Sequence, residues 1–125
     1  MEIPELPEEI KKILQKHNAP ERLHRHLRIV SFTAANLLAE ITKAWSLLEV
    51  DIALVKFGAL THDIGKVLQQ NEIYEGGKKH ELLGEKLLIE YGFSKDASRF
   101  AYTHGNWKAE HTTLEDLLIT LADKA

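Results

Sequence analysis

The feature that most constrains this chain is a stripe of apolar residues at helical spacing across residues 20–41. Alanine, leucine, isoleucine and valine recur there three and four positions apart. The stripe consists of Leu23, Leu27, Val30, Ala34, Leu37, Leu38 and Ile41. Because a helix turns once in 3.6 residues, this spacing places the side chains on one face. The segment is therefore predicted to be a long amphipathic helix, starting near Pro20, that covers a hydrophobic core.

The remaining sequence also reads as helices joined by short breaks, and it contains no strand-like alternation longer than chance. Further helices are predicted over residues 7–17, about 50–66, 80–92, 94–105 and 112–125. Pro7, Ser94 and a Thr112–Glu115 capping box suit helix starts, and Gly92 suits a helix end. The polar stretch 69–79 carries Gly76 and Gly77 and is predicted to be a loop.

These patterns predict an all-α, single-domain bundle of about six helices over residues 1–125. We expect the N-terminal helix within residues 1–19 and the motif-bearing core in about 20–125. The length of 125 residues suits one hydrophobic core. The last predicted helix is still in phase at Ala125, so we expect that it frays there or that the parent gene product is longer.

Composition excludes several classes of function. The chain has no cysteine, which rules out disulfides, thiolate catalysis and zinc sites built on cysteine. A net charge of −3 gives no overall attraction to nucleic acid or anionic membranes. There is no glycine-rich phosphate loop and no basic stripe interleaved with aromatics, so a nucleic-acid duplex is not an expected partner. No apolar run approaches the ~20 residues of a membrane-spanning helix, and no secretory signal is evident, so a cytoplasmic protein without a membrane partner is expected.

Titratable side chains on four successive predicted helices share the inward-facing apolar stripes. They are His26, His62, Asp63, His80 and His104, with Asp123 near the rim of the last stripe. A single inward histidine is most simply a core residue satisfied by a hydrogen bond. Burying this many imidazoles and carboxylates without compensation costs several kcal/mol. A bound cation is the simplest compensation, because it stabilises carboxylate and neutral imidazole together.

The ordered residues resemble the HD-domain superfamily of metal-dependent phosphohydrolases in its HDIG-type form. The resemblance is carried by His26, the "HDIGK" of residues 62–66, the "HELLGEKLL" of 80–88, His104 and the "LADK" of 121–124. It implies an all-helical fold whose first metal is held by His26, His62, Asp63 and Asp123. It also implies a second metal held by His80 and His104, with Asp63 bridging the two. Imidazole and carboxylate ligands suit iron, manganese, cobalt, nickel or zinc better than magnesium, and we favour two ions over one.

The resemblance implies hydrolysis of a phosphate ester or anhydride in a nucleotide-like small molecule. Two ions about 3.5–4 Å apart would share a water, activate it as a bridging hydroxide and stabilise the attacking and leaving oxygens. We expect Asp63 and Lys66 to be catalytic, and Lys66 also to bind substrate phosphate at the mouth of the site. Arg25 is a further phosphate-binding candidate, and Asn106 and Trp107 are candidates for a base or sugar wall.

Three functions remain open on the sequence alone. The leading one is the phosphohydrolase, and the motifs look in part like bacterial symmetrical dinucleoside tetraphosphate hydrolases, which are longer. A second is a di-iron oxygenase of a small organic substrate, since a minority branch of the superfamily uses the same ligand arrangement. The third is a binding module for metal or nucleotide that performs no chemistry. The identity of the bound metal and the turnover of phosphates distinguish them.

Overall fold

The structure, a computed structural model, describes residues 5–103 and 113–124, and this part of the chain folds entirely into helices and loops without a strand. The all-α fold predicted from the sequence is confirmed. The helices are α1 (Glu8–Lys16), α2 (Glu21–Ala44), α3 (Ile52–Thr61), the short 3₁₀ helix η1 (Ile64–Val67), α4 (Glu72–Glu75), α5 (Lys79–Glu90), α6 (Lys95–Ser98), α7 (Phe100–Thr103) and α8 (Leu114–Lys124).

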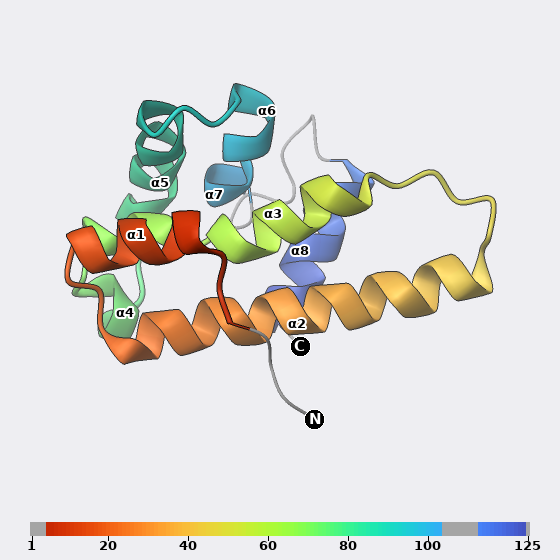
Figure 1. The fold of residues 1–125 in the computed structure, drawn as a ribbon, viewed down its shortest axis with the longest axis horizontal. Coiled ribbons are helices and arrows are strands. Elements are labelled where there is room, and N and C mark those ends of the chain that lie inside the picture. Colours follow the sequence, from red (N-terminus) through yellow and green to blue (C-terminus); the bar gives the residue numbers. More distant parts are fainter. Residues whose placement is uncertain (1–4, 104–112, 125) are drawn as a thin grey trace.

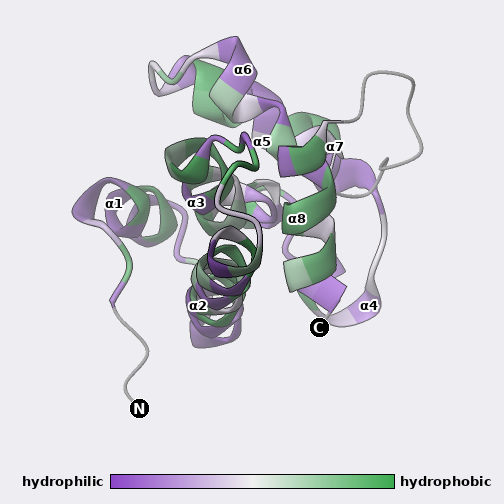
Figure 2. Ribbon diagram, turned by 90° about the vertical axis from the view of Figure 1, so that its right-hand side faces the viewer, coloured by the Kyte–Doolittle hydropathy of each residue, from purple (hydrophilic) through white to green (hydrophobic). Residues whose placement is uncertain are grey.

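The long helix α2 forms one side of the molecule, and α3 and α8 both pack against it (Figure 1). Its apolar stripe is buried as predicted except at Leu37 and Ile41, which are partly buried, and the side of α2 that faces away from α3 is hydrophilic (Figure 2). The buried side chains form two clusters. One joins α1, η1 and α5 to the first turns of α2, and the other joins α3, Phe100 and α8 to its middle. His26 lies on α2 between Leu23 and Leu27, which belong to the first cluster. Val30 of the second cluster follows one turn later.

The prediction of one continuous helix over residues 50–66 is wrong, because the helix breaks at His62 and Asp63. α3 ends at Thr61, and Asp63, with φ −108° and ψ 14°, precedes η1. The break lets Gly65 approach the backbone of α5 so closely that a Cβ there would lie 1.9 Å from the carbonyl oxygen of His80. It would also lie 2.6 Å from the amide nitrogen of Gly84. The two glycines therefore hold η1 against α5 and bring His80 beside Asp63.

The capping predictions are partly confirmed. Ser94 caps α6 by accepting a hydrogen bond from the amide of Ala97 at 3.1 Å. The capping box of α8 lies one residue later than predicted: Thr113 Oγ1 accepts from the Asp116 amide at 3.2 Å, and an Asp116 carboxylate oxygen accepts from the Thr113 amide at 2.8 Å. Reciprocal bonds of this kind satisfy amides that a helix start leaves free. Thr112 lies outside the described residues.

Two other segments differ from the predictions. The predicted loop 69–79 contains the short helix α4, although Gly76 and Gly77 adopt positive φ angles of 76° and 136° as a loop with glycines predicts. The predicted helix 94–105 consists, as far as it is described, of α6 and α7 separated at Arg99. Both differences concern short helices of four residues, whose formation depends on neighbouring packing more than on sequence pattern.

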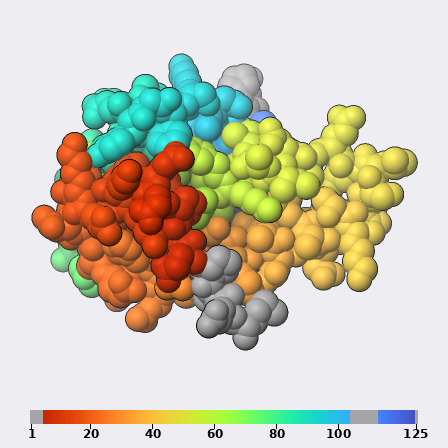
Figure 3. All heavy atoms as spheres, viewed as in Figure 1, coloured from red at the N-terminus to blue at the C-terminus, as the bar shows by residue number. Residues whose placement is uncertain are grey.

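The connection between α2 and α3 projects from the rest of the molecule (Figure 3). It carries apolar side chains into solvent, since Trp45 is 65% exposed and Leu47 is 94% exposed. This projection lies at the end of α2 opposite the one that carries His26 (Figure 1). None of the described helices has the length and hydropathy that crossing a bilayer requires.

Candidate metal centre

Four of the predicted ligands converge on one point from three parts of the chain. His26 comes from α2, His62 and Asp63 from the junction of α3 with η1, and Asp123 from α8. One ligand atom from each of these residues lies within 4.8 Å of every other. His62 is completely buried, while His26 is more exposed and borders an open cavity. A continuous helix would direct the adjacent side chains of His62 and Asp63 about 100° apart. The break after α3 allows both side chains to reach the same point.

The spacing of these atoms fits a single cation. His26 Nε2 lies 3.2 Å from His62 Nε2, 2.9 Å from Asp63 Oδ2 and 3.2 Å from Asp123 Oδ1. His62 Nε2 lies 3.3 Å from Asp63 Oδ2 and 3.2 Å from Asp123 Oδ1. An ion with bonds of ~2.1 Å holds ligands ~3.0 Å apart at right angles and ~3.4 Å apart at the tetrahedral angle. The observed distances match this range.

The chemistry of the donor atoms also fits a cation. His62 Nδ1 lies 2.8 Å from the carbonyl oxygen of Ala59, to which it donates. In the neutral imidazole, Nε2 then carries the lone pair and points it at the other ligand atoms. A lone pair and two carboxylates facing one another require positive charge between them, supplied by a metal ion or by a proton. A backbone carbonyl that fixes the ring in this way is a common partner of a metal-ligating histidine.

The pKa shifts of the ligand residues show that this cluster favours a positive charge. Burial lowers the pKa of His62, but the charges and hydrogen bonds of Asp63 and Asp123 outweigh it and raise this pKa to about 10. Hydrogen bonds to Asp123 and Asp63 likewise raise the pKa of His26. Burial opposes ionisation of Asp123, yet hydrogen bonds from His26 and His62 lower its pKa well below the usual range. The cluster thus stabilises both carboxylate and cation.

The other oxygen of Asp63 faces His80. Asp63 Oδ1 lies 3.2 Å from His80 Nε2, whereas its Oδ2 faces His26 and His62. Asp63 therefore presents one oxygen to each side, an arrangement that would suit a carboxylate shared by two ions. His80 is oriented by Glu72, whose Oε1 accepts a hydrogen bond from His80 Nδ1 at 2.7 Å. Such a carboxylate–histidine pair fixes the tautomer of a ligand.

Glu72 is a candidate site residue that the sequence reasoning missed. It is buried on α4, and its carboxylate also accepts from the backbone amides of Lys79 and His80 at the start of α5. Burial opposes ionisation of Glu72, but the hydrogen bonds from His80 and these amides lower its pKa. Its position eight residues before His80 exceeds the spacing of local capping motifs, so no sequence signal identified the contact.

A cavity of about 450 Å³ opens over the cluster, and three lysines line it together with Glu81, Gly77 and the residues His26, Asp63, His80 and Asp123. Lys66 Nζ lies 3.3 Å from Asp63 Oδ2, and Lys78 and Lys124 also line the cavity. Arg25 is exposed and lines neither this cavity nor the smaller one beside it. Arg22, one turn before His26 on α2, lines the smaller cavity instead. His104, Asn106 and Trp107 lie outside the described residues.

Comparison with known proteins identifies the family. The sequence model of the HD domain matches residues 23–125, and the chain therefore belongs to the HD-domain superfamily of metal-dependent phosphohydrolases. Two curated relatives are named Ribonuclease Y. The protein from Acidothermus cellulolyticus is 32% identical over 120 residues, which cover 96% of this chain and 22% of that protein. The protein from Fusobacterium nucleatum subsp. nucleatum is 28% identical over 120 residues, which cover 96% and 21%.

The chain thus spans about a fifth of the length of these relatives. No solved structure matches it significantly.

Proposed function

We propose that this chain is a metal-dependent phosphohydrolase that cleaves a phosphate ester or anhydride bond of a nucleotide-like substrate. The observation that carries the proposal is the convergence of two imidazole nitrogens and two carboxylate oxygens beneath an open cavity to which three lysines contribute. The ligand cluster suits a transition-metal ion, and the lysines suit an anion. An anionic substrate meets this lining better than the uncharged organic substrate of an oxygenase.

The residues would divide between two ions as follows. His26, His62, Asp63 and Asp123 would hold the first ion, as their mutual distances support. Asp63 Oδ1 and His80 face a second position, and His104 remains the predicted further ligand there. We therefore favour two ions drawn from iron, manganese, cobalt, nickel and zinc. When bound, they would supply Lewis acidity and an activated water for attack at phosphorus.

The side chains around the ligands have their own roles in this proposal. Lys66 is partly buried, with 18% of its side chain exposed, and its ammonium group would bind an oxygen of the scissile phosphate. Its contact with Asp63 keeps it at the edge of the ligand cluster. Lys78 and Lys124 line the same cavity and would attract the anionic substrate. Glu72 would keep the His80 ring directed toward Asp63.

The substrate we place first is a phosphodiester of a nucleotide. Both relatives are named as ribonucleases, and phosphodiester bonds join the nucleotides of RNA. The cavity is open and large enough for one nucleotide unit at the metal ligands, since small-molecule sites occupy ~300–1,000 Å³. In a dinucleoside polyphosphate, the same attack at phosphorus would cleave a phosphoanhydride bond. Such a molecule is the comparison substrate.

The test joins metal content to turnover. Protein purified without chelator is analysed for metals and assayed with bis-p-nitrophenyl phosphate, the dinucleotide ApA and diadenosine tetraphosphate. We expect bound transition metal and hydrolysis of a phosphodiester, and both should be lost in Asp123→Ala. Glu90→Ala, which removes an exposed carboxylate on α5, is the control and should keep both.

Two results would contradict the proposal. Full metal content in Asp123→Ala would remove that residue from the ligand set. Bound iron without turnover of any phosphate, together with oxygen consumption on an organic substrate, would replace hydrolysis by oxygenation.

A further inference from the structure

A second, smaller cavity lies directly beside the metal centre. Its volume is about 220 Å³, and it is lined by Arg22, Leu23, His26, Lys66 and Ile73. His26 and Lys66 line this cavity and the larger one alike, so the two are neighbours that share a wall. A group bound in the smaller cavity would therefore belong to the same substrate as a phosphate bound over the ligand cluster.

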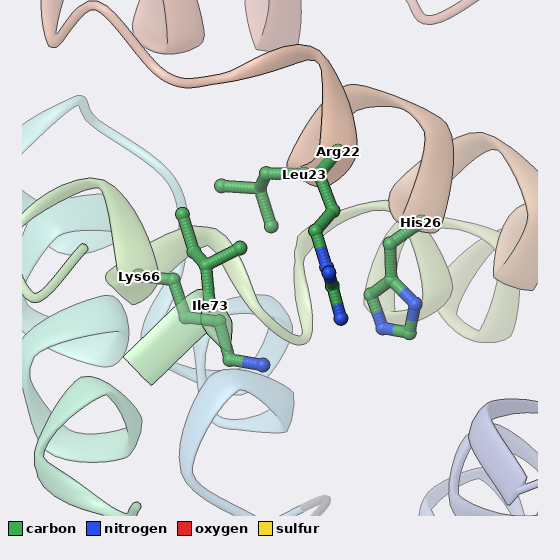
Figure 4. Close-up of a pocket in the computed structure, with 5 residues that line it drawn as sticks. All are labelled: Arg22, Leu23, His26, Lys66 and Ile73. Carbon is green, nitrogen blue, oxygen red and sulfur yellow. The ribbon is translucent and has the colours of Figure 1, made fainter. Parts of the chain in front are cut away.

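The charged groups of the small cavity come from two elements. Figure 4 shows Arg22 of α2 and Lys66 of η1 extending toward the same space beside the His26 ring. Lys66 contacts Asp63, but no described carboxylate pairs with Arg22, whose guanidinium lies 5.3 Å from the centre of the Tyr74 ring. Arg22 thus faces the cavity as a cation without a carboxylate partner among these residues. A planar guanidinium binds phosphate through two parallel hydrogen bonds.

The rest of the lining limits what can bind. Leu23 is buried at 1% exposure and Ile73 at 9%, and together they give the cavity an apolar floor. The volume lies below the ~300 Å³ at which typical small-molecule sites begin, so the cavity suits a small charged group better than a whole nucleoside. A phosphate with the adjoining part of a ribose suits both the size and the combination of cations with an apolar floor.

We propose that this cavity is a subsite for the phosphate next to the scissile one, held by Arg22, with the Lys66 ammonium at the shared wall in reach of both phosphates. The inference rests on the proposed hydrolase function and defines its substrate class as a nucleotide chain with at least two successive phosphates. The scissile phosphate lies over the ligand cluster, and the flanking phosphate enters the small cavity. Arg22 is a binding and specificity residue in this scheme and takes no part in the chemical step.

The experiment compares two dinucleotides that differ by one flanking phosphate. The full chain is loaded with Mn²⁺, and KM and kcat are measured for pApA and ApA. Wild type should have a KM about tenfold lower for pApA, because a charge-assisted hydrogen bond contributes a factor of this order. Arg22→Ala should remove the preference by raising KM for pApA alone, with little change in kcat.

The matched control is Arg25→Ala, which removes an exposed arginine of the same helix that lines neither cavity. It should keep the preference for pApA. Arg22 is itself exposed, so its replacement should leave the fold intact, as circular dichroism and thermal unfolding will check. Equal KM values of wild type for pApA and ApA, or an equal loss for both in Arg22→Ala, would overturn the subsite.

A binding measurement separates this inference from the proposed function. Calorimetry with phosphorothioate-linked analogues of pApA and ApA measures affinity without requiring turnover. Tighter binding of the pApA analogue that depends on Arg22 supports the subsite even if neither dinucleotide is hydrolysed. Equal affinities overturn it even if both are hydrolysed. A preference for diadenosine tetraphosphate over pApA that Arg22→Ala abolishes would keep the flanking-phosphate site and assign the phosphate to an anhydride chain.

Discussion

At the scale of single residues, Glu72 links helix formation to ligand orientation. Its carboxylate accepts hydrogen bonds from the backbone amides of Lys79 and His80 and from Nδ1 of the His80 ring. Glu72→Ala should lower the free energy of unfolding by about 1–2 kcal/mol, the usual effect of losing a helix N-terminal acceptor. It should also lower metal content at the His80 position, because the ring loses the partner that fixes its tautomer. Urea unfolding and metal analysis measure the two effects.

Glu75→Ala provides the control for this prediction. Glu75 lies on the same short helix as Glu72 but is exposed, so its removal should change unfolding free energy by less than about 0.5 kcal/mol. Wild-type metal content in Glu72→Ala would show that the His80 ring keeps its orientation without this carboxylate.

Residues of the site were predictable where helical spacing alone determines the direction of a side chain. His26 shares the stripe of Leu23 and Val30, and the structure brings it to the cluster as this spacing predicts. The same rule favours Arg22 over Arg25, because a residue four positions before His26 shares its face and the adjacent one does not. Adjacency to His26 had pointed to Arg25, which lines neither cavity, whereas Arg22 lines the one beside the site. Glu72 carried no comparable signal.

At the scale of elements, the contact between η1 and α5 depends on Gly65. A methyl group at this position would overlap the His80 carbonyl oxygen at 1.9 Å, and backbone on both sides cannot give way easily. Gly65→Ala should therefore destabilise the fold by about 1–3 kcal/mol or more, since overpacking forces backbone shifts. It should also separate Asp63 from His80 and reduce hydrolysis. Thermal unfolding and the phosphodiesterase assay provide the measurements.

Gly84→Ala is the comparison for this helix contact. Its Cβ would lie 3.0 Å from the Ala101 side chain and the Gly65 amide nitrogen, a milder approach than at Gly65. Alanine also gains up to about 1 kcal/mol in helix propensity over glycine, so the net loss should be smaller than at Gly65. An equal or larger loss for Gly84→Ala would mean that the closest backbone approach does not lie at Gly65.

The capping box of α8 should give the fold a defined dependence on pH. Burial opposes ionisation of Asp116, but hydrogen bonds from Thr113 and Thr103 and the charge of Arg99 outweigh it and lower its pKa below the ordinary 3.8. A lowered pKa means that the carboxylate stabilises the fold above the unfolded-state value and loses this effect as the pH falls. Asp116→Asn should thus cost about 1–3 kcal/mol at neutral pH, and the difference from wild type should shrink below about pH 3.8.

Urea unfolding of both proteins from pH 7 to pH 2 measures this difference. A constant difference across the whole range would show that the variant acts through packing and not through the charge of Asp116.

The element boundaries show where sequence reasoning ends. The stripes of α2 and α8 are periodic over several turns, and the predicted helices were found there. The break after α3 left no mark in the apolar run, because it accompanies a contact between Gly65 and α5 that the local pattern does not encode. The same holds for α4, which is too short for a periodic pattern and lies where the chain covers His80. Tertiary contacts decide these elements.

At the scale of the whole molecule, a bound ion should stabilise the fold because its ligands come from α2, the α3–η1 junction and α8. Metal at about 100 times its dissociation constant adds about 2.7 kcal/mol, which for a chain of this size raises Tm by roughly 10 °C. Titration of Mn²⁺ in a thermal unfolding assay should show this rise. Asp123→Ala should abolish it, and an undiminished rise in that variant would place the ion elsewhere.

The contact between His26 and Asp123 also has a consequence for the order of folding. These residues lie 3.2 Å apart, yet they are 97 positions apart in the sequence. Closing a long loop costs entropy before any contact compensates for it, so pairings of this kind form late. Helices near each other along the chain can assemble first, without a complete ligand cluster. A nascent or partly unfolded chain therefore lacks the complete ligand cluster, and the recovery of metal binding during refolding should follow the last step of assembly.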